Sequence, residues 1–298
     1  MSLPALQEEK TAIIKQEKVI TPFQQKLRLF LQNKLAIAGS VLVLFFVFIA
    51  IAAPLIASQG IDEQELSKRL LPPSSEHWFG TDDFGRDIFS RVLFGARISL
   101  WVGFFSVLGS ALIGTLLGIL AGYYGRVIDS IISRLFDIML AFPSILLAIA
   151  IVAILGPSLQ NALIAIAVIN IPNFGRLIRA KVLSVKEEEY IMAAKALGTS
   201  DTRILLVHVL PNSLSPIIVQ ASLAIATAII EAAALGFLGL GAQAPNPEWG
   251  KMLADSKQYL VQAPWTLFFP GLAIMLTVLG FNLMGDGLRD ALDPKGKH

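Results

Sequence analysis

The chain contains no cysteine and only three histidines. Without cysteine it can form no disulfide bond, no thiolate metal site and no cysteine nucleophile. The histidines, His77, His208 and His298, lie far apart in the sequence, which argues against a structural zinc site built on them. The Gly-x-Ser-x-Gly motif of serine hydrolases is also absent. These absences argue against an enzyme active site and against a bound metal.

A phosphate-binding loop is missing as well. Such a loop needs Gly, four residues, Gly-Lys and then Ser or Thr. The two Gly-Lys pairs, at Lys251 and Lys297, are not followed by Ser or Thr, and neither has a glycine five residues before its own. If ATP drives this protein, a partner must therefore supply the binding site.

Charge is sparse and apolar residues are abundant. Hydrophobic residues make up 55% of the 298 residues and charged residues only 15%, whereas soluble domains carry roughly 25% charged residues. The net charge of +2 is too small to indicate a nucleic-acid partner. The composition predicts an integral membrane protein. Four stretches lack any charged residue, and each exceeds the ~20 residues that a membrane span needs: 35–61, 98–125, 138–175 and 258–285.

Proline and glycine divide the apolar stretches into helices. The stretch 138–175 is too long for one span, and Gly156-Pro157 predicts a turn near its middle. In a fifth stretch, 204–230, Pro211 and Pro216 argue against one continuous helix, so we expect the span to begin near Pro216. The prediction is an all-α integral membrane fold with six transmembrane helices, at 35–56, 99–123, 134–155, 160–178, 216–238 and 265–285.

Lysine and arginine are distributed unevenly between the flanking segments. Most of the 24 fall in the N-terminal arm, the loop after the fourth helix and the C-terminus. This asymmetry predicts that both termini face the cytoplasm. Residues 1–34 then form a cytoplasmic arm, helical in part at 23–31, and residues 35–298 form the transmembrane domain. Its polar segments are an external loop at 58–97, a cytoplasmic loop at 180–214 and an external loop at 239–264.

The cytoplasmic loop has the pattern of two short helices. Glu189 follows two other glutamates, and acidic residues favour the start of a helix. Ala193 and Ala194 are strong helix formers, and Gly198 is a natural helix end. Asp201 or the serine before it can cap a second helix. The small alanine pair would let another surface approach closely, although an ordinary amphipathic connector could share this pattern.

The spacing within this loop is specific. The alanine pair, Gly198 and the later Leu-Pro are spaced as in the EAA loop of ABC importer permeases, which this segment resembles. In that family the loop forms a coupling helix that docks in a groove of the ATP-hydrolysing subunit. The family glutamate is replaced by Met192 here, so Glu189, one turn earlier, would have to substitute. The resemblance implies an ATPase-coupling role for Glu189, Ala193, Ala194, Gly198, Asp201, Leu210 and Pro211.

The resemblance covers nearly the whole chain. It implies the type I ABC importer permease fold and a place in the bacterial inner membrane. The implied partners are a second homologous permease in a heterodimer, two ATP-binding subunits and an external solute-binding protein. ATP and Mg²⁺ would bind to the ATP-binding subunits, and no cofactor to this chain. The segments similar to dipeptide, oligopeptide and nickel permeases of the DppC/OppC type are 77–91, 95–99, 236–241, 247–250, 252–255 and 280–294.

The function implied by the resemblance is the translocation of di- or oligopeptides. Nickel or a metal chelate is the alternative cargo. A secondary transporter working alone would show inverted repeats or several buried charges, and we find no clear repeat. A membrane enzyme is disfavoured because the catalytic motifs sought above are absent.

Charged residues gather in the first external segment. Asp82 and Asp87 could be ligands of a hard cation, but Arg86 and Arg91 nearby indicate internal ion pairs instead. Apolar residues at helical spacing within 84–97 suit a helix on the outer membrane surface. We expect these four charged residues to form a scaffold or a docking surface for the external binding protein.

Glu231 is an acid inside a predicted span, where charge is expensive. It would line the translocation path or pair across the interface between permeases. The alternatives are a protonated acid bonded to the helix backbone or a residue near the membrane surface. Glycines four residues apart in the second span, at Gly114, Gly118 and Gly122, predict close helix packing.

Overall fold

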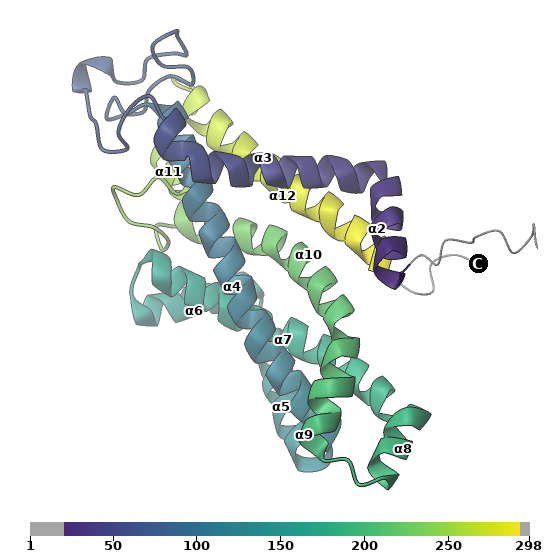
Figure 1. Cartoon of the computed structure of the whole chain (residues 1–298). Helices are drawn as coiled ribbons and strands as arrows, with labels where there is room; N and C mark the ends of the chain where they lie inside the picture. The colour runs from purple at the N-terminus through teal and green to yellow at the C-terminus, as the bar shows by residue number, and fades with distance from the viewer. Residues whose placement is uncertain (1–20, 293–298) are drawn as a thin grey trace, which may run out of the picture.

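The computed structural model describes residues 21–292, so most of the predicted N-terminal arm and the end of the last matched segment lie outside the described residues (Figure 1). Between residues 21 and 292 the chain is helical and has no strand, apart from one isolated bridge between Thr81 and Asp87. The all-α prediction is confirmed. The α-helices are α2 (Pro22–Gln32), α3 (Lys34–Ile56), α4 (Ile88–Tyr124), α5 (Arg126–Ala141), α6 (Ser144–Leu155), α7 (Leu159–Lys186), α8 (Glu189–Ala196), α9 (Asp201–Ile204), α10 (Leu210–Phe237), α11 (Trp249–Ser256) and α12 (Trp265–Leu292).

Five helical segments are long and apolar enough to cross a membrane. They are α3, α4, α7, the continuous run Asp201–Phe237, and α12. The pair α5 and α6 passes the same test together and would make a sixth span, although the two helices are bent by 95°. The predicted turn at Gly156-Pro157 is present, because α6 ends at Leu155 and the Ser158 side chain caps α7.

The single helix predicted at 134–155 is wrong, because two helices cover this range. The chain breaks between α5 and α6 at Phe142 and Pro143. Proline cannot donate a backbone hydrogen bond, and it pushes the residue before it out of the helical region. Phe142 accordingly is extended, with φ −93° and ψ 141°. The signal for this break was a single proline within an otherwise apolar stretch.

The start predicted near Pro216 for the fifth span is also wrong, because the helical run begins at Asp201 and passes through both prolines. A π-helical turn, η2 (Leu205–Val209), precedes α10 and is closed by the bond from the Leu210 N–H to the Leu205 carbonyl. Pro211 follows this π-helical turn as the second residue of α10. Pro216 is accepted inside the helix.

Other helices extend beyond the predicted spans. The expected surface helix within 84–97 is instead the start of α4, which runs unbroken for 37 residues and so reaches past the membrane. The first polar segment ends at α4 and contains the short 3₁₀ helix η1 (Leu66–Lys68). At the other end of the molecule, α7 continues to Lys186 and α12 to Leu292. The other predicted external loop, 239–264, contains α11 and the 3₁₀ helix η3 (Lys257–Tyr259).

Helices α4 and α7 pack closely through the glycine stripe. A Cβ atom on Gly114 would lie 2.7 Å from the Ile171 carbonyl oxygen, and one on Gly118 would lie 2.5 Å from the Gly175 carbonyl oxygen. The two backbones therefore approach to a distance that only glycine permits, which confirms the packing predicted from the spacing.

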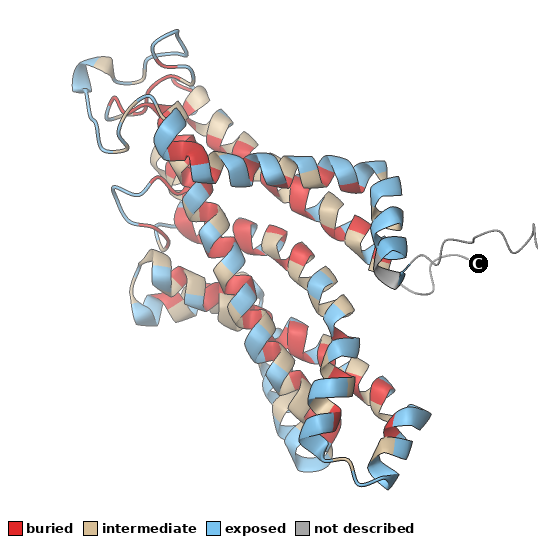
Figure 2. Cartoon of the chain, viewed as in Figure 1, coloured by how far each residue is buried: buried red, intermediate tan, exposed pale blue. Residues whose placement is uncertain are grey.

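The outward faces of the long helices are exposed (Figure 2), and many of their exposed residues are large and apolar. On α3, Leu44, Phe48 and Leu55 are exposed, while Ala36, Val43 and others on the inward face are buried. Apolar residues on an outer surface are expected where lipid rather than water is the neighbour.

Candidate functional site

The predicted coupling segment forms a short helix with a defined end. Helix α8 runs from Glu189 to Ala196 and is followed by Gly198 at φ +79°. The Gly198 N–H donates to the Lys195 carbonyl over 2.9 Å, and the Thr199 N–H donates to the Ala194 carbonyl over 3.0 Å. This pair of bonds is the Schellman motif, whose turning residue needs a left-handed conformation. The predicted helix end at Gly198 is confirmed.

Helix α8 is attached by one buried side chain and leaves an apolar face open. Ile191 is fully buried in a cluster formed with α4, α7 and the start of the Asp201–Phe237 run. By contrast, 55% of Met192 and 86% of Leu197 are exposed. Ala193 is exposed and Ala194 half-buried. Exposed apolar residues on a polar-flanked helix at the end of a membrane domain mark a surface for another protein.

The seven residues predicted for this site are not all together. Glu189, Ala193, Ala194 and Gly198 lie on or directly after α8, and Asp201 begins α9. Leu210 and Pro211 instead lie at the start of α10 and contribute to the long helix rather than to the α8 surface. Leu197 directly precedes Gly198 and is not part of the motif, but it is more exposed than the other large apolar residues of this surface. Its position between an alanine helix and a turning glycine was the signal available in the sequence.

Tyr123 joins α4 to both short helices and was not predicted. Its hydroxyl donates to Asp201 Oδ1 over 2.5 Å. The Lys195 ammonium of α8 lies 4.8 Å from the centre of the Tyr123 ring, within the range of a cation–π contact. One side chain at the end of α4 therefore contacts both α8 and α9. We call this contact the Tyr123 clamp.

A second contact connects α8 to α10. The Asn212 amide donates to the Tyr190 hydroxyl over 3.3 Å and to the His208 carbonyl over 2.7 Å. The Tyr190 and His208 rings also meet edge to face, with centroids 5.9 Å apart. Helix α8 thus contacts both α4 and α10.

At the opposite end of the molecule, Asp82 organises the first polar segment. Its carboxylate accepts from Arg86 Nε over 2.7 Å and from the backbone N–H groups of Phe84 and Arg86, and it lies 3.6 Å from Arg91 Nε. Asp82, Arg86 and Arg91 are all buried. The expected internal ion pairs are present, and their charges are satisfied within the chain.

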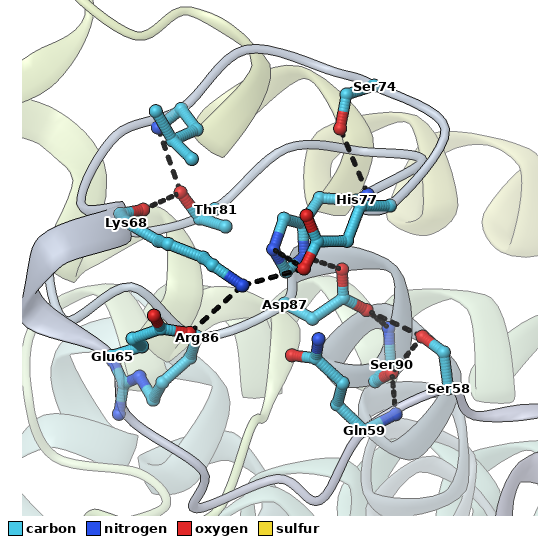
Figure 3. Close-up of polar contacts among 12 residues, drawn as sticks. Ser58, Gln59, Glu65, Lys68, Ser74, His77, Thr81, Arg86, Asp87 and Ser90 are labelled. Atoms are coloured by element: carbon cyan, nitrogen blue, oxygen red, sulfur yellow. Dashed lines mark hydrogen bonds and ion pairs between the residues drawn. The ribbon is translucent and has the colours of Figure 1, made fainter.

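Asp87 makes a different set of contacts (Figure 3). It caps α4 by accepting from the Ser90 N–H over 2.8 Å, and its other oxygen lies 3.1 Å from His77 Nδ1. Ser58, at the start of the polar segment, lies 3.4 Å from the same carboxylate. The His77 contact was not predicted, because ten residues separate the pair. Since Asp87 and His77 are both buried, they hold the segment against α4 and leave its exposed residues, such as Trp78, to form the outer surface.

Glu231 lies between α10 and α7. It is 8% exposed, and its Oε2 accepts from the Asn170 amide over 2.9 Å. Asn170 also donates to the Ile166 carbonyl, and Asn173 donates to Asn170 Oδ1 over 3.4 Å. The partner of Glu231 is thus a side-chain amide rather than helix backbone. Asn173 is exposed, so this polar chain leads from the buried acid to the surface of α7.

Comparison with known proteins agrees with this arrangement. Residues 114–298 match the model of the binding-protein-dependent transport system inner membrane component, and residues 21–73 match that of the N-terminal transmembrane domain of oligopeptide transport permease C. A dipeptide transport system permease protein of Alkalihalophilus pseudofirmus is 66% identical over 93% of this chain and 91% of its own. A glutathione transport system permease protein of Pectobacterium atrosepticum is 50% identical over 96% and 95% of the two chains.

A solved structure shows the same fold. A chain of the MetNI methionine ABC transporter, in an inward-facing conformation, superimposes with a TM-score of 0.55 at 21% identity, over 69% of this chain and 98% of its own. The family implies ATP-binding and substrate-binding partners for a membrane subunit. From the family match, the relatives and the apolar spans, the chain belongs to the binding-protein-dependent transport system inner membrane components, the multi-pass permease subunits of ABC importers.

Proposed function

We propose that this permease translocates di- and oligopeptides across the bacterial inner membrane. The observation that carries the transport role is α8, a short helix with an exposed apolar face held between two long helices. The relatives named for dipeptide and glutathione transport support a peptide cargo.

We further propose an assembly in which the α8 end faces the cytoplasm, with both chain termini on that side. A second homologous permease would complete a heterodimer, and two ATP-binding subunits would dock, one on the α8 face of each permease. ATP and Mg²⁺ would bind to those subunits, since no phosphate-binding loop occurs in this sequence. This chain would thus hydrolyse no ATP and hold no cofactor. An external solute-binding protein would deliver the cargo to the opposite end.

In this assembly, closure of the ATP-binding subunits would displace α8, and the long helices would follow. The Tyr123 clamp would carry the displacement to α4, and the Tyr190–Asn212 contact would carry it to α10. Because α4 packs on α7 through glycine backbones, the two would move as one unit. The scaffold around Asp82, Arg86, Asp87 and Arg91 would hold the outer surface on which the binding protein docks.

The cargo is tested by uptake in matched cells with and without this gene. We expect cells lacking the gene to lose uptake of labelled dipeptide and to keep uptake of nickel ion. Labelled longer peptide, assayed in parallel, reports the length preference. Loss of nickel uptake alone would leave the permease role intact and overturn the peptide assignment.

Tyr123→Phe is expected to lower peptide uptake about tenfold, because it removes a hydrogen bond to a charged group worth roughly 1.5–3 kcal/mol. The ring and its contact with Lys195 remain, so insertion and assembly should be unchanged. In the purified importer, ATP hydrolysis should continue but respond less to peptide-loaded binding protein. A weaker response of ATP hydrolysis to peptide-loaded binding protein would show that Tyr123 couples the subunits, because a loss of structure alone would lower the amount of assembled importer instead.

Tyr124→Phe is the matched control. Tyr124 is the next residue, it is exposed, and no hydrogen bond of its hydroxyl is present among the described residues. We expect wild-type uptake from this variant. Equal losses in the two variants would contradict the clamp.

Glu231 is proposed to line the translocation path or to meet the second permease. Glu231→Gln preserves the shape and can still accept from Asn170, but removes the carboxylate. If the acid contacts cargo or partner, peptide uptake should fall about tenfold with normal amounts of assembled importer. Unchanged uptake by Glu231→Gln would show that Glu231 serves only the contact between α7 and α10.

A further inference from the structure

A basic pocket lies between α2, α7, α10 and α12. Its volume is about 720 Å³. Lys26 from α2, Lys181 from α7 and Arg289 from α12 line it together with polar residues of α10, among them Ser215. These three cations come from three helices that are distant in sequence, so the fold rather than a local motif gathers them.

The pocket carries charge of one sign. No acidic residue lines it. Within residues 21–292, Lys26, Lys181 and Arg289 take part in no ion pair and in no hydrogen bond to a carboxylate. Three cations around one cavity, with no carboxylate partner among the described residues, repel one another and favour an anion between them.

The pocket lies near the C-terminal ends of α7 and α12. Helix α2 turns away from α3 at Asn33 (Figure 1) and is fastened to the end of α12, where the Asn33 amide donates to Asp290 Oδ2 over 3.3 Å. Helix α2 exposes Leu27 and Leu31 beside its cations, as expected of a helix lying in a membrane interface.

The lining changes with depth. Lys181 and Arg289 lie near the ends of their helices, whereas Leu177 lies one turn deeper along α7 and Leu223 two turns deeper than Ser215 along α10. The cations therefore lie at the rim, and the deeper lining is mostly apolar, with Leu177, Val219 and Leu223 beside Gln220. A soluble anion such as phosphate or a nucleotide would satisfy the rim and leave the floor unfilled, but an anionic lipid matches both.

We propose that this basic pocket binds an anionic phospholipid of the leaflet at the α8 end, with the phosphate between Lys26, Lys181 and Arg289 and an acyl chain along Leu177 and Leu223. The site borders Asn212, which contacts Tyr190 of α8, so the lipid would brace the start of α10. The proposal depends on the membrane placement of the chain and not on the cargo.

The test uses the assembled importer, purified in a neutral detergent and titrated with phosphatidylglycerol, while native mass spectrometry counts bound lipids. We expect saturable binding that the variant K26Q/K181Q/R289Q weakens about a hundredfold, because each cation near a lipid phosphate contributes roughly fivefold. The matched control is R28Q/K34Q/R134Q, which removes three exposed cations that do not line the pocket. It should bind like the wild type.

Three results would overturn the proposal. Equal binding of phosphatidylcholine would show that the three cations do not select an anionic headgroup. Displacement of lipid by inorganic phosphate would assign the site to a soluble anion. Unchanged binding by the triple pocket variant would place the lipid elsewhere. If that variant fails to assemble, K26R/K181R/R289K and the single change K181Q decide instead: the first should keep binding and the second should weaken it about fivefold.

Discussion

Replacing Gly198 with leucine is expected to lower peptide uptake roughly thirtyfold or more, the effect of losing about 2 kcal/mol at a central contact residue. The variant should still insert into the membrane. Gly198 has φ +79°, a conformation that costs an ordinary residue about 1–2 kcal/mol. An added Cβ atom would meet nothing within 4 Å, so the leucine would project from the end of α8 into the proposed ATPase contact. Labelled dipeptide uptake, normalised to the amount of protein in the membrane, measures the effect.

Gly239→Leu separates the surface from the backbone strain. Gly239 follows α10 with φ +78°, also has open space around a Cβ, and donates to the Gly236 carbonyl over 2.9 Å while the next N–H donates to the Leu235 carbonyl. Its turn is thus the same as that of Gly198, but it lies at the opposite end of the molecule. We expect Gly239→Leu to keep most of its uptake. Equal losses from the two leucine variants would attribute both to strain and remove the support for the α8 contact.

Asp82→Asn is expected to destabilise the first polar segment by about 3–5 kcal/mol, because it leaves two buried cations without their partner. Arg86 and Arg91 are both buried, and Asp82 is the carboxylate that pairs with each. Asparagine can keep some hydrogen bonds but not the charge. The importer should lose binding of its solute-binding protein and become sensitive to protease between α3 and α4. Limited proteolysis in right-side-out membrane vesicles measures this directly.

Asp83→Asn is the control at the neighbouring position. Asp83 is half-buried and takes part in none of the ion pairs of Asp82, and burial holds the pKa of its carboxyl above the usual value. A raised pKa means that folding disfavours the charged form, so removing the charge should change stability by no more than about 0.5 kcal/mol. A protease sensitivity equal to that of Asp82→Asn would show that the segment responds to any loss of acid rather than to the buried pair.

Much of the architecture could be predicted from the sequence because its signals are local. A membrane span is defined by about 20 consecutive apolar residues, whatever lies elsewhere in the chain. The end of α8 could be predicted because Gly198 acts on its own turn, and the contact of α4 with α7 because glycines four residues apart lie on one helix face. The ion pairs of Asp82 could be predicted, since the residues lie within nine positions of each other.

The tertiary structure decided what depends on distant partners. The sequence could not show that Tyr123 meets Asp201, that Glu231 meets Asn170, or that three cations share one pocket, because these residues are separated by 61 positions or more. The sequence also led to a wrong prediction at two prolines, for the single helix at 134–155 and for the start of the fifth span. Pro143 bends a span, whereas Pro216 is accepted within one. Proline removes the same hydrogen bond in each case, and only the packing around the helix decides whether the chain bends or continues.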